Sequence, residues 1–139
     1  MIAVDTNVFV YSIDQNEPVK QAKALNLLNR LPSEPTPTLL LWQALVESVR
    51  QLRRWQDSGR ITRQELLGYV AHFRNLFPLS LPTPNVLDAA LDLSGRFSLS
   101  HWDSMILGAC KDAGVTTLYT EEMGAPTVYD GIQLINPFV

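Results

Sequence analysis

The sequence predicts one α/β domain spanning residues 1–139, a three-layer α/β/α sandwich around a mainly parallel sheet. Three observations support this fold class. Short apolar runs typical of buried strands alternate with longer segments whose apolar residues recur at helical spacing. Two of the strand-like runs end directly in acids, at Asp5 and at Glu121-Glu122. A length of 139 residues suits one domain with a real core and is too short for two ordinary ones.

The first strand is expected at residues 2–4, because an apolar run too short for a helix is typical of a strand buried on both faces. Pro18 in a first turn then predicts a helix that continues to about Arg30. A proline-rich loop follows. The run Leu39–Leu41 is too short to assign, and it either ends a strand or leads into the next helix.

A long helix is predicted from about Leu41 to Asp57. Its expected buried stripe consists of Trp42, Leu45, Val46, Val49 and Leu52. Thr62 and Glu65 have the spacing of a capping box and begin another helix that ends at about Asn75. The run 76–81 predicts a second short strand around Pro78.

The last third of the chain repeats this alternation. A helix is expected from Thr83-Pro84 to about Gly95, with a buried side formed by Val86, Leu87, Ala90, Leu91 and Leu93. Residues 100–113 predict a further helix that stops at Gly114. The β-branched run 115–120 predicts a strand, and residues 131–135 predict the last one.

Composition narrows the classes of function. The content of 46% hydrophobic and 18% charged residues argues against disorder. A net charge of -3 argues against general polyanion binding, but not against a nucleic-acid enzyme whose negative charge gathers at a metal site. Cys110 is the only cysteine, so an internal disulfide and a cysteine-based zinc site are excluded. Without a signal-peptide pattern or an apolar run of about 18 residues, a cytoplasmic protein is expected.

Asp5 is the first candidate for chemistry. It follows a predicted strand, and in open α/β sheets ligands bind beyond the carboxyl ends of the strands. The alternative is a structural role as a helix N-cap or turn residue, which Asp also favours.

Glu47 and Asp103 are the next candidates. Glu47 lies off the apolar stripe of its helix, and its structural alternative is a solvated pair with Arg50. Asp103 follows Ser100 at capping-box spacing, yet Leu107 shares its helix face and places the carboxylate near apolar surroundings. A bound cation would resolve that conflict.

Glu121 and Glu122 follow a second strand in the way that Asp5 follows the first. If the two strands are neighbours, several carboxylates face one crevice. Two unit charges about 4 Å apart repel by about 4 kcal/mol at an effective dielectric constant of 20. Such a cluster takes up protons or binds metal, and oxygen-only ligands favour Mg²⁺ or Mn²⁺.

Over essentially its whole length the chain resembles the PIN-domain ribonucleases, and closely the toxin halves of VapBC-type toxin–antitoxin pairs. The matching segments are Val4-Asp5-Thr6-Asn7-Val8, Val46-Glu47-Ser48, Leu99-Ser100-His101-Trp102-Asp103-Ser104, Leu118-Tyr119-Thr120-Glu121-Glu122-Met123 and the C-terminal stretch from Tyr129 to Phe138.

The resemblance implies an α/β/α fold, Mg²⁺- or Mn²⁺-dependent cleavage of RNA, a homodimer and a cognate antitoxin. It assigns the catalytic acids to Asp5, Glu47, Asp103 and Glu122. The family more often has Asp at the fourth position, so either Glu122 binds the metal from further back or Glu121 shares that role. Three polar residues complete the implied site: Thr6 and Asn7 beside the first acid, and Ser104 as a contact to phosphate or metal-bound water.

The basic residues have two interpretations. Five of the eleven Lys and Arg residues lie in one predicted helix pair: Arg50, Arg53, Arg54, Arg60 and Arg63. They form either a solvated face or a rim, with Arg50 and Arg54 as substrate contacts, that steers RNA phosphates toward the acidic crevice.

Other classes fit less well. A phosphatase of the haloacid-dehalogenase kind needs a second Asp where this chain has Asn7, and a receiver domain needs a late Lys, but none follows Lys111. The remaining alternative is a PIN-like binding module that acts through a protein partner with little nuclease activity. The presence of acids at all the implied positions argues against it.

Overall fold

A computed structural model describes residues 1–139. Its centre is a six-stranded sheet with the order β3-β2-β1-β4-β6-β5. All neighbouring pairs are parallel except β5 with β6, so the predicted mainly parallel sheet is confirmed. The strands are β1 (Ile2–Val4), β2 (Thr38–Leu41), β3 (Leu79–Ser80), β4 (Thr117–Tyr119), β5 (Thr127–Tyr129) and β6 (Ile132–Ile135).

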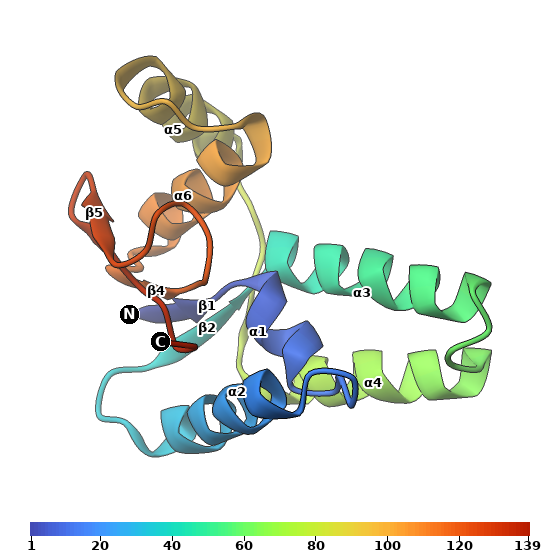
Figure 1. Ribbon diagram of the computed structural model, residues 1–139. Coiled ribbons are helices and arrows are strands. Elements are labelled where there is room, and N and C mark those ends of the chain that lie inside the picture. The colour runs from blue at the N-terminus through green and yellow to red at the C-terminus, as the bar shows by residue number, and fades with distance from the viewer.

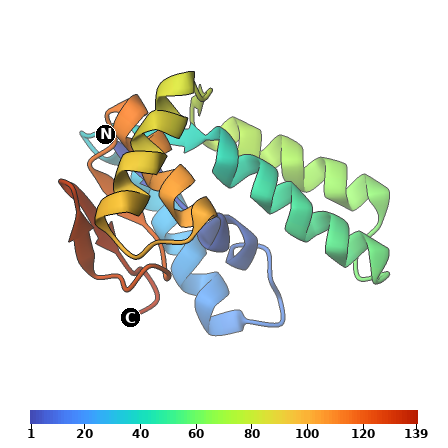
Figure 2. The same cartoon turned by 90° about the horizontal axis from the view of Figure 1, so that it is seen from above.

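Six helices surround the sheet and confirm the layered α/β/α arrangement. They are α1 (Thr6–Tyr11), α2 (Pro18–Arg30), α3 (Trp42–Asp57), α4 (Arg63–Leu76), α5 (Pro84–Arg96) and α6 (His101–Ala113), with a short 3-10 turn η1 (Leu31–Ser33). Helices α5 and α6 lie on one side of the sheet, and α1 and α2 lie on the other (Figure 1). Helices α3 and α4 run side by side and project away from the sheet (Figures 1 and 2). None of the helices combines the length and the apolar character needed to cross a membrane.

Local sequence signals account for most helix ends. The predicted capping box is complete, because the Glu65 amide donates to the Thr62 hydroxyl at 3.1 Å and the Thr62 amide donates to Glu65 Oε1 at 3.0 Å. Gly114 ends α6 with a φ of 74°, a conformation that glycine adopts without steric cost. Helix α5 begins with Pro84 in its first turn after the N-cap Thr83.

Two elements were not predicted. Helix α1 follows β1 at once, because Asp5 ends the strand and caps the helix in the same position. Strand β5 pairs with β6 across the two-residue turn Asp130-Gly131, and both turn residues have positive φ. An Asp-Gly pair is a strong hairpin signal, so the sequence contained the evidence for β5. The unassigned run at residues 39–41 proves to be strand.

The hydrophobic core lies between the sheet and its helices, and Phe9 and Phe73 pack in it with ring centroids 5.5 Å apart. The predicted buried stripes are wrong at four positions, Trp42, Val46, Leu87 and Leu91, which are exposed. These residues lie on outward faces, because α3 projects from the sheet and α5 packs on α6 rather than on the strands. Trp42 and Val46 instead line an apolar groove of about 280 Å³ together with Leu81, Trp102 and Met105.

Candidate active site

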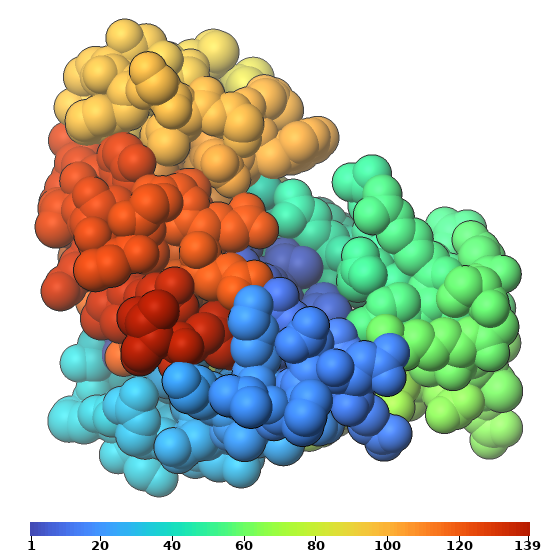
Figure 3. Space-filling model, in the orientation of Figure 1, coloured from blue at the N-terminus to red at the C-terminus, as the bar shows by residue number.

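An acidic pocket of about 450 Å³ lies beyond the carboxyl ends of β1 and β4. These strands are parallel neighbours with Val4 opposite Tyr119, so Asp5 and the segment after Tyr119 leave the sheet at one edge. Helices α3 and α6 form further walls of the pocket. In the space-filling view, atoms of the first residues lie at the bottom of a hollow between α2, α3 and the C-terminal half of the chain (Figure 3). Asp5, Glu47, Asp103, Glu121 and Glu122 all line this pocket.

Asp5 is the most buried of these acids, with an exposed fraction of 7%. Its Oδ1 accepts a hydrogen bond from the Thr6 amide at 2.8 Å, and its Oδ2 accepts one from the Thr120 hydroxyl at 2.8 Å. Asp5 is also the N-cap of α1. The structural alternative, a helix N-cap, is therefore confirmed, and because the cap and the strand end coincide, Asp5 also lies at the edge of the sheet where ligands are expected.

Burial raises the pKa of Asp5 to about 6, against an ordinary value of 3.8. The hydrogen bonds from Thr120 and Thr6 oppose this shift, and the charges of Glu122 and Glu47 add to it. Burial therefore disfavours the carboxylate form of Asp5, and a cation beside it would stabilise that form.

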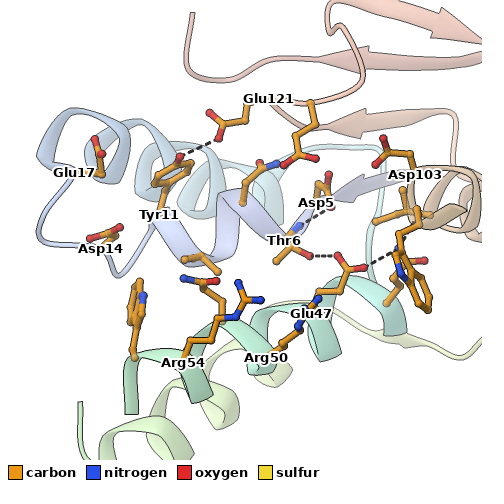
Figure 4. A pocket seen from close by; sticks show the side chains of 18 residues that line it. Asp5, Thr6, Tyr11, Asp14, Glu17, Glu47, Arg50, Arg54, Asp103 and Glu121 are labelled. Atoms are coloured by element: carbon orange, nitrogen blue, oxygen red, sulfur yellow. Dashed lines mark hydrogen bonds between the residues drawn. The ribbon is translucent and has the colours of Figure 1, made fainter. Parts of the chain in front are cut away.

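Glu47 is half-buried and faces the pocket from α3 (Figure 4). Its Oε2 accepts a hydrogen bond from the Thr6 hydroxyl at 3.3 Å, and its Oε1 accepts one from Gln43 Nε2 at 3.1 Å. The same Gln43 amide donates to the main-chain oxygen of Trp102 at 2.9 Å. No ion pair joins Glu47 to Arg50, so the solvated-pair alternative is wrong.

Asp103 lies in the first turn of α6 and is half-buried. Its main-chain amide donates to the Ser100 hydroxyl at 3.2 Å, but its carboxylate makes no reciprocal bond to the Ser100 amide. Leu107, one turn further on, is fully buried as predicted. The cap therefore uses only the main chain of Asp103, and the carboxylate is left to the pocket.

Glu121 and Glu122 differ sharply. The Glu121 carboxylate accepts from the Tyr11 hydroxyl at 2.9 Å and pairs with Lys20 Nζ at 2.9 Å. Glu122 makes hydrogen bonds only through its main chain: its amide donates to the Thr120 hydroxyl at 3.0 Å, and its oxygen accepts from the Ala125 amide at 3.1 Å. Partial burial, followed by the charges of Asp103, Glu121 and Glu47, raises the pKa of Glu122.

Of the polar residues predicted to contact the substrate, all but Ser104 line the pocket. Thr6 and Asn7 line the pocket, and Asn7 Nδ2 donates to the Thr120 hydroxyl at 3.4 Å while its buried Oδ1 has no partner. Arg50 and Arg54 are exposed and line the wall that α3 forms (Figure 4). Ser104 is not brought to the pocket, because it is buried and its hydroxyl donates to the Ser100 oxygen at 2.8 Å.

Sequence reasoning missed the residues that hold the acids in place: Thr120, Gln43, Tyr11 and Lys20. The only available signal was at Thr120, a hydroxyl residue directly between a strand and two acids. Gln43 is one turn before Glu47 on α3 and Tyr11 ends the helix that follows Asp5, but neither carried a signal of its own, and Lys20 comes from α2, which the sequence does not link to the site.

The chemical type of the candidate ligands in the pocket fits a hard divalent cation such as Mg²⁺ or Mn²⁺. All candidate ligands are oxygens, several are carboxylates whose charges oppose one another, and the Asn7 Oδ1 is a buried oxygen without a partner. With the side chains as they stand, no three acids form a group that could hold an ion.

The fold and the pocket define an α/β/α protein with an acidic cluster at the carboxyl edge of a parallel sheet. No protein-family model matches the chain, and no curated protein matches its sequence. Solved structures do match it. The chain has the PIN-domain fold of VapC toxins, as the resemblance predicted.

Three of these structures cover nearly the whole chain. VapC20 from Mycobacterium tuberculosis, a Sarcin-Ricin loop cleaving toxin, is 13% identical over 96% of this chain and 99% of that one, with a TM-score of 0.64. VapBC2 from Rickettsia felis, bound to a DNA fragment from its promoter, is 14% identical over 96% and 97%, with a TM-score of 0.68. A toxin–antitoxin complex from Klebsiella pneumoniae is 15% identical over 99% and 98%, with a TM-score of 0.63.

Proposed function

We propose that this chain is an endoribonuclease that depends on Mg²⁺ or Mn²⁺ and acts as the toxin of a toxin–antitoxin pair. The observation that carries the proposal is the convergence of Asp5, Glu47, Asp103 and Glu122 from separate elements on one pocket. This convergence occurs in a fold shared with a toxin that cleaves the Sarcin-Ricin loop.

The acids divide into two roles. Asp5 and Asp103 would hold the ion directly, and Glu47 and Glu122 would hold or orient the attacking water. A bound divalent ion supplies an activated water at neutral pH and neutralises charge on the phosphate. Thr6 contributes by fixing two acids at once, because its amide bonds to Asp5 and its hydroxyl bonds to Glu47.

The wall that α3 forms suits an RNA strand. Arg50 and Arg54 lie one turn apart on α3 and both line the pocket. Their guanidinium groups make no ion pair with protein acids, so they are free to bind phosphates. They offset the repulsion that RNA would meet at the acidic cluster.

The similarity to solved toxin–antitoxin structures also supports a protein partner for this chain. VapBC2 and the Klebsiella pneumoniae protein were solved as toxin–antitoxin complexes, which supports a cognate antitoxin for this chain. The exposed apolar groove beside the pocket supports a protein interface, either with an antitoxin or in a homodimer. Since the proposed substrate is cellular RNA, we expect the protein to act in the cytoplasm.

The test is cleavage of structured RNA, including a Sarcin-Ricin loop hairpin, by the wild type and by Asp5→Asn. We expect cleavage with Mn²⁺, none with EDTA, and a loss of at least about 100-fold in Asp5→Asn, since that residue touches the reacting centre. Asp88→Asn, an exposed acid on α5, is the control that keeps full activity. A cleavage rate that changes neither on addition of EDTA nor in Asp5→Asn would disprove the proposal.

The second candidate is a binding module that acts through a partner. The apolar groove favours it, because exposed Trp102 and Leu81 on a surface are typical of a protein contact. Absence of cleavage by the wild type, together with tight binding of a partner, would favour this function.

A further inference from the structure

We propose that Lys20 and Tyr11 hold Glu121 as an anchor for the segment after β4, so that Glu122 is the only one of the two adjacent acids that serves the metal site. This inference rests on the proposed function, because it assigns roles at the same pocket. It makes Lys20, Tyr11 and Glu121 positioning residues and not catalytic ones.

Both carboxylate oxygens of Glu121 are engaged. Oε1 accepts from the Tyr11 hydroxyl at 2.9 Å, and Oε2 accepts from Lys20 Nζ at 2.9 Å (Figure 4 shows the first bond). Lys20 Nζ also donates to the Tyr11 hydroxyl at 3.2 Å, which closes a three-membered network. A Glu121 that binds a metal ion would have to give up these bonds.

The network is set among aromatic rings. Lys20 Nζ lies 4.6 Å from the centroid of the Tyr11 ring and 5.7 Å from that of Phe138, and the two rings pack edge to face at 5.1 Å. The Lys20 and Glu121 side chains are 37% and 22% exposed, so their pairing is partly shielded from solvent. The network therefore joins α1, α2, the segment after β4 and the C-terminal residues.

Glu122 is placed by what lies before it in the chain. Thr120 is fixed to Asp5, and Glu121 is fixed to Lys20 and Tyr11. The main chain is thus held at two successive residues, and the Glu122 carboxylate is left without a hydrogen-bond partner among the charges of the pocket. Glu122 is exposed and lines the pocket, so its carboxylate is free to turn toward a bound cation, whereas that of Glu121 is not.

The first experiment measures Mn²⁺ binding by calorimetry in Glu121→Gln and Glu122→Gln, a matched pair of isosteric changes at adjacent residues. We expect Kd to rise at least about tenfold in Glu122→Gln and less than about threefold in Glu121→Gln, because a Gln side chain at position 121 keeps an oxygen that accepts from Tyr11 or Lys20 and so retains part of the anchor. An equal loss in both variants would overturn the assignment of the acids while leaving the proposed function intact. A wild type that binds no Mn²⁺ would overturn the metal-dependent function itself, and this inference with it.

The second experiment tests the anchor by charge reversal. Lys20→Glu places two acids together and is expected to weaken Mn²⁺ binding about tenfold by releasing the segment, whereas Lys20→Glu combined with Glu121→Lys restores the pair and most of the affinity. If Glu121 were a ligand, the double variant would bind no better than the single one. If Lys20→Glu fails to fold, as thermal unfolding would show, Tyr11→Phe is the milder test, because it removes the two hydrogen bonds of the Tyr11 hydroxyl and keeps the Lys20–Glu121 ion pair. Unchanged binding in that variant and in Lys20→Gln would overturn the anchor.

Discussion

The Thr120 hydroxyl donates a 2.8 Å hydrogen bond to Oδ2 of Asp5, across two neighbouring parallel strands. The same hydroxyl oxygen accepts bonds from the Glu122 amide and from Asn7 Nδ2. Thr120 is fully buried. One side chain thus connects the most buried acid of the pocket to the segment that presents the fourth acid.

Replacing Thr120 with the nearly isosteric Val should shift the pH dependence of RNA cleavage. The hydroxyl bond lowers the pKa of Asp5, so its loss moves the acidic limb of kcat/KM to higher pH. Loss of a hydrogen bond to a charged group is worth about 1.5–3 kcal/mol, so activity at pH 6 should fall at least about tenfold. Thr116→Val, an exposed position just before β4, is the control. An unchanged acidic limb would show that Thr120 does not tune Asp5.

Asp5→Asn should stabilise the protein near pH 7. The folded-state pKa of about 6 lies above the ordinary 3.8, so the folded protein retains the proton that the unfolded chain loses first. Stability therefore falls as pH rises from about 4 to 6, and the penalty is complete above that window. Removing the charge should add about 1–3 kcal/mol to the unfolding free energy at pH 7 and little near pH 4. Urea denaturation at the two pH values checks this, and equal effects at both would contradict it.

Divalent ions should raise the melting temperature, and more so at pH 8 than at pH 5. Ligands must lose their protons to bind a metal, and the pKa values of Asp5 and Glu122 are both raised. At an ion concentration of about 100 times Kd, the added stability is about 2.7 kcal/mol. Thermal unfolding with Mn²⁺ and then with excess EDTA measures the effect, and Asp103→Asn should reduce it. A shift that is the same at both pH values would point to a site other than the carboxylates.

Arg50→Ala and Arg54→Ala should each raise KM for RNA about three- to tenfold with a smaller change in kcat, because the role proposed for both is to bind phosphates away from the reacting bond. Each should also reduce the salt dependence of binding by about 0.7 in log–log slope. Arg53→Ala is a matched control, since Arg53 is exposed on the same helix but lies outside the pocket. Equal effects of all three substitutions would indicate a general charge effect.

Gly108→Ala should destabilise the fold. A Cβ at Gly108 would lie 2.6 Å from the main-chain oxygen of Val86 and 3.0 Å from the amide of Ala90, both in α5. Forcing α5 and α6 apart should cost about 1–3 kcal/mol of unfolding free energy. Gly68→Ala in α4 is the control, because nothing lies within 4 Å of its added Cβ and helix propensity should add about 0.5–1 kcal/mol. Denaturant unfolding compares the two variants.

The sequence was sufficient where the signals are local. The Thr62–Glu65 capping box, Pro84 in a first turn and Gly114 at a helix end each depend on neighbours within a few residues. Helical periodicity failed for Leu87 and Leu91, because spacing shows that residues share a face but not whether another layer covers that face. The Asp130-Gly131 turn was a local signal that was overlooked.

For the candidate site, too, local signals were recognised in the sequence and contacts between distant segments were not. The acids were proposed from strand ends and from the family resemblance, and so was Thr6 beside Asp5, but the partners from distant segments were not. Thr120 is 115 residues from Asp5, and Glu121 is 101 residues from Lys20. Such contacts exist only because β1 pairs with β4, and no periodicity within one segment predicts that pairing.

Gln43 and Trp102 line both the acidic pocket and the apolar groove. These two side chains therefore lie at the boundary between the acidic pocket and the apolar groove. A compound that binds in the apolar groove and displaces Trp102 would therefore also change the wall of the acidic pocket. Such a compound would bind through apolar contacts and would not need a metal-chelating group.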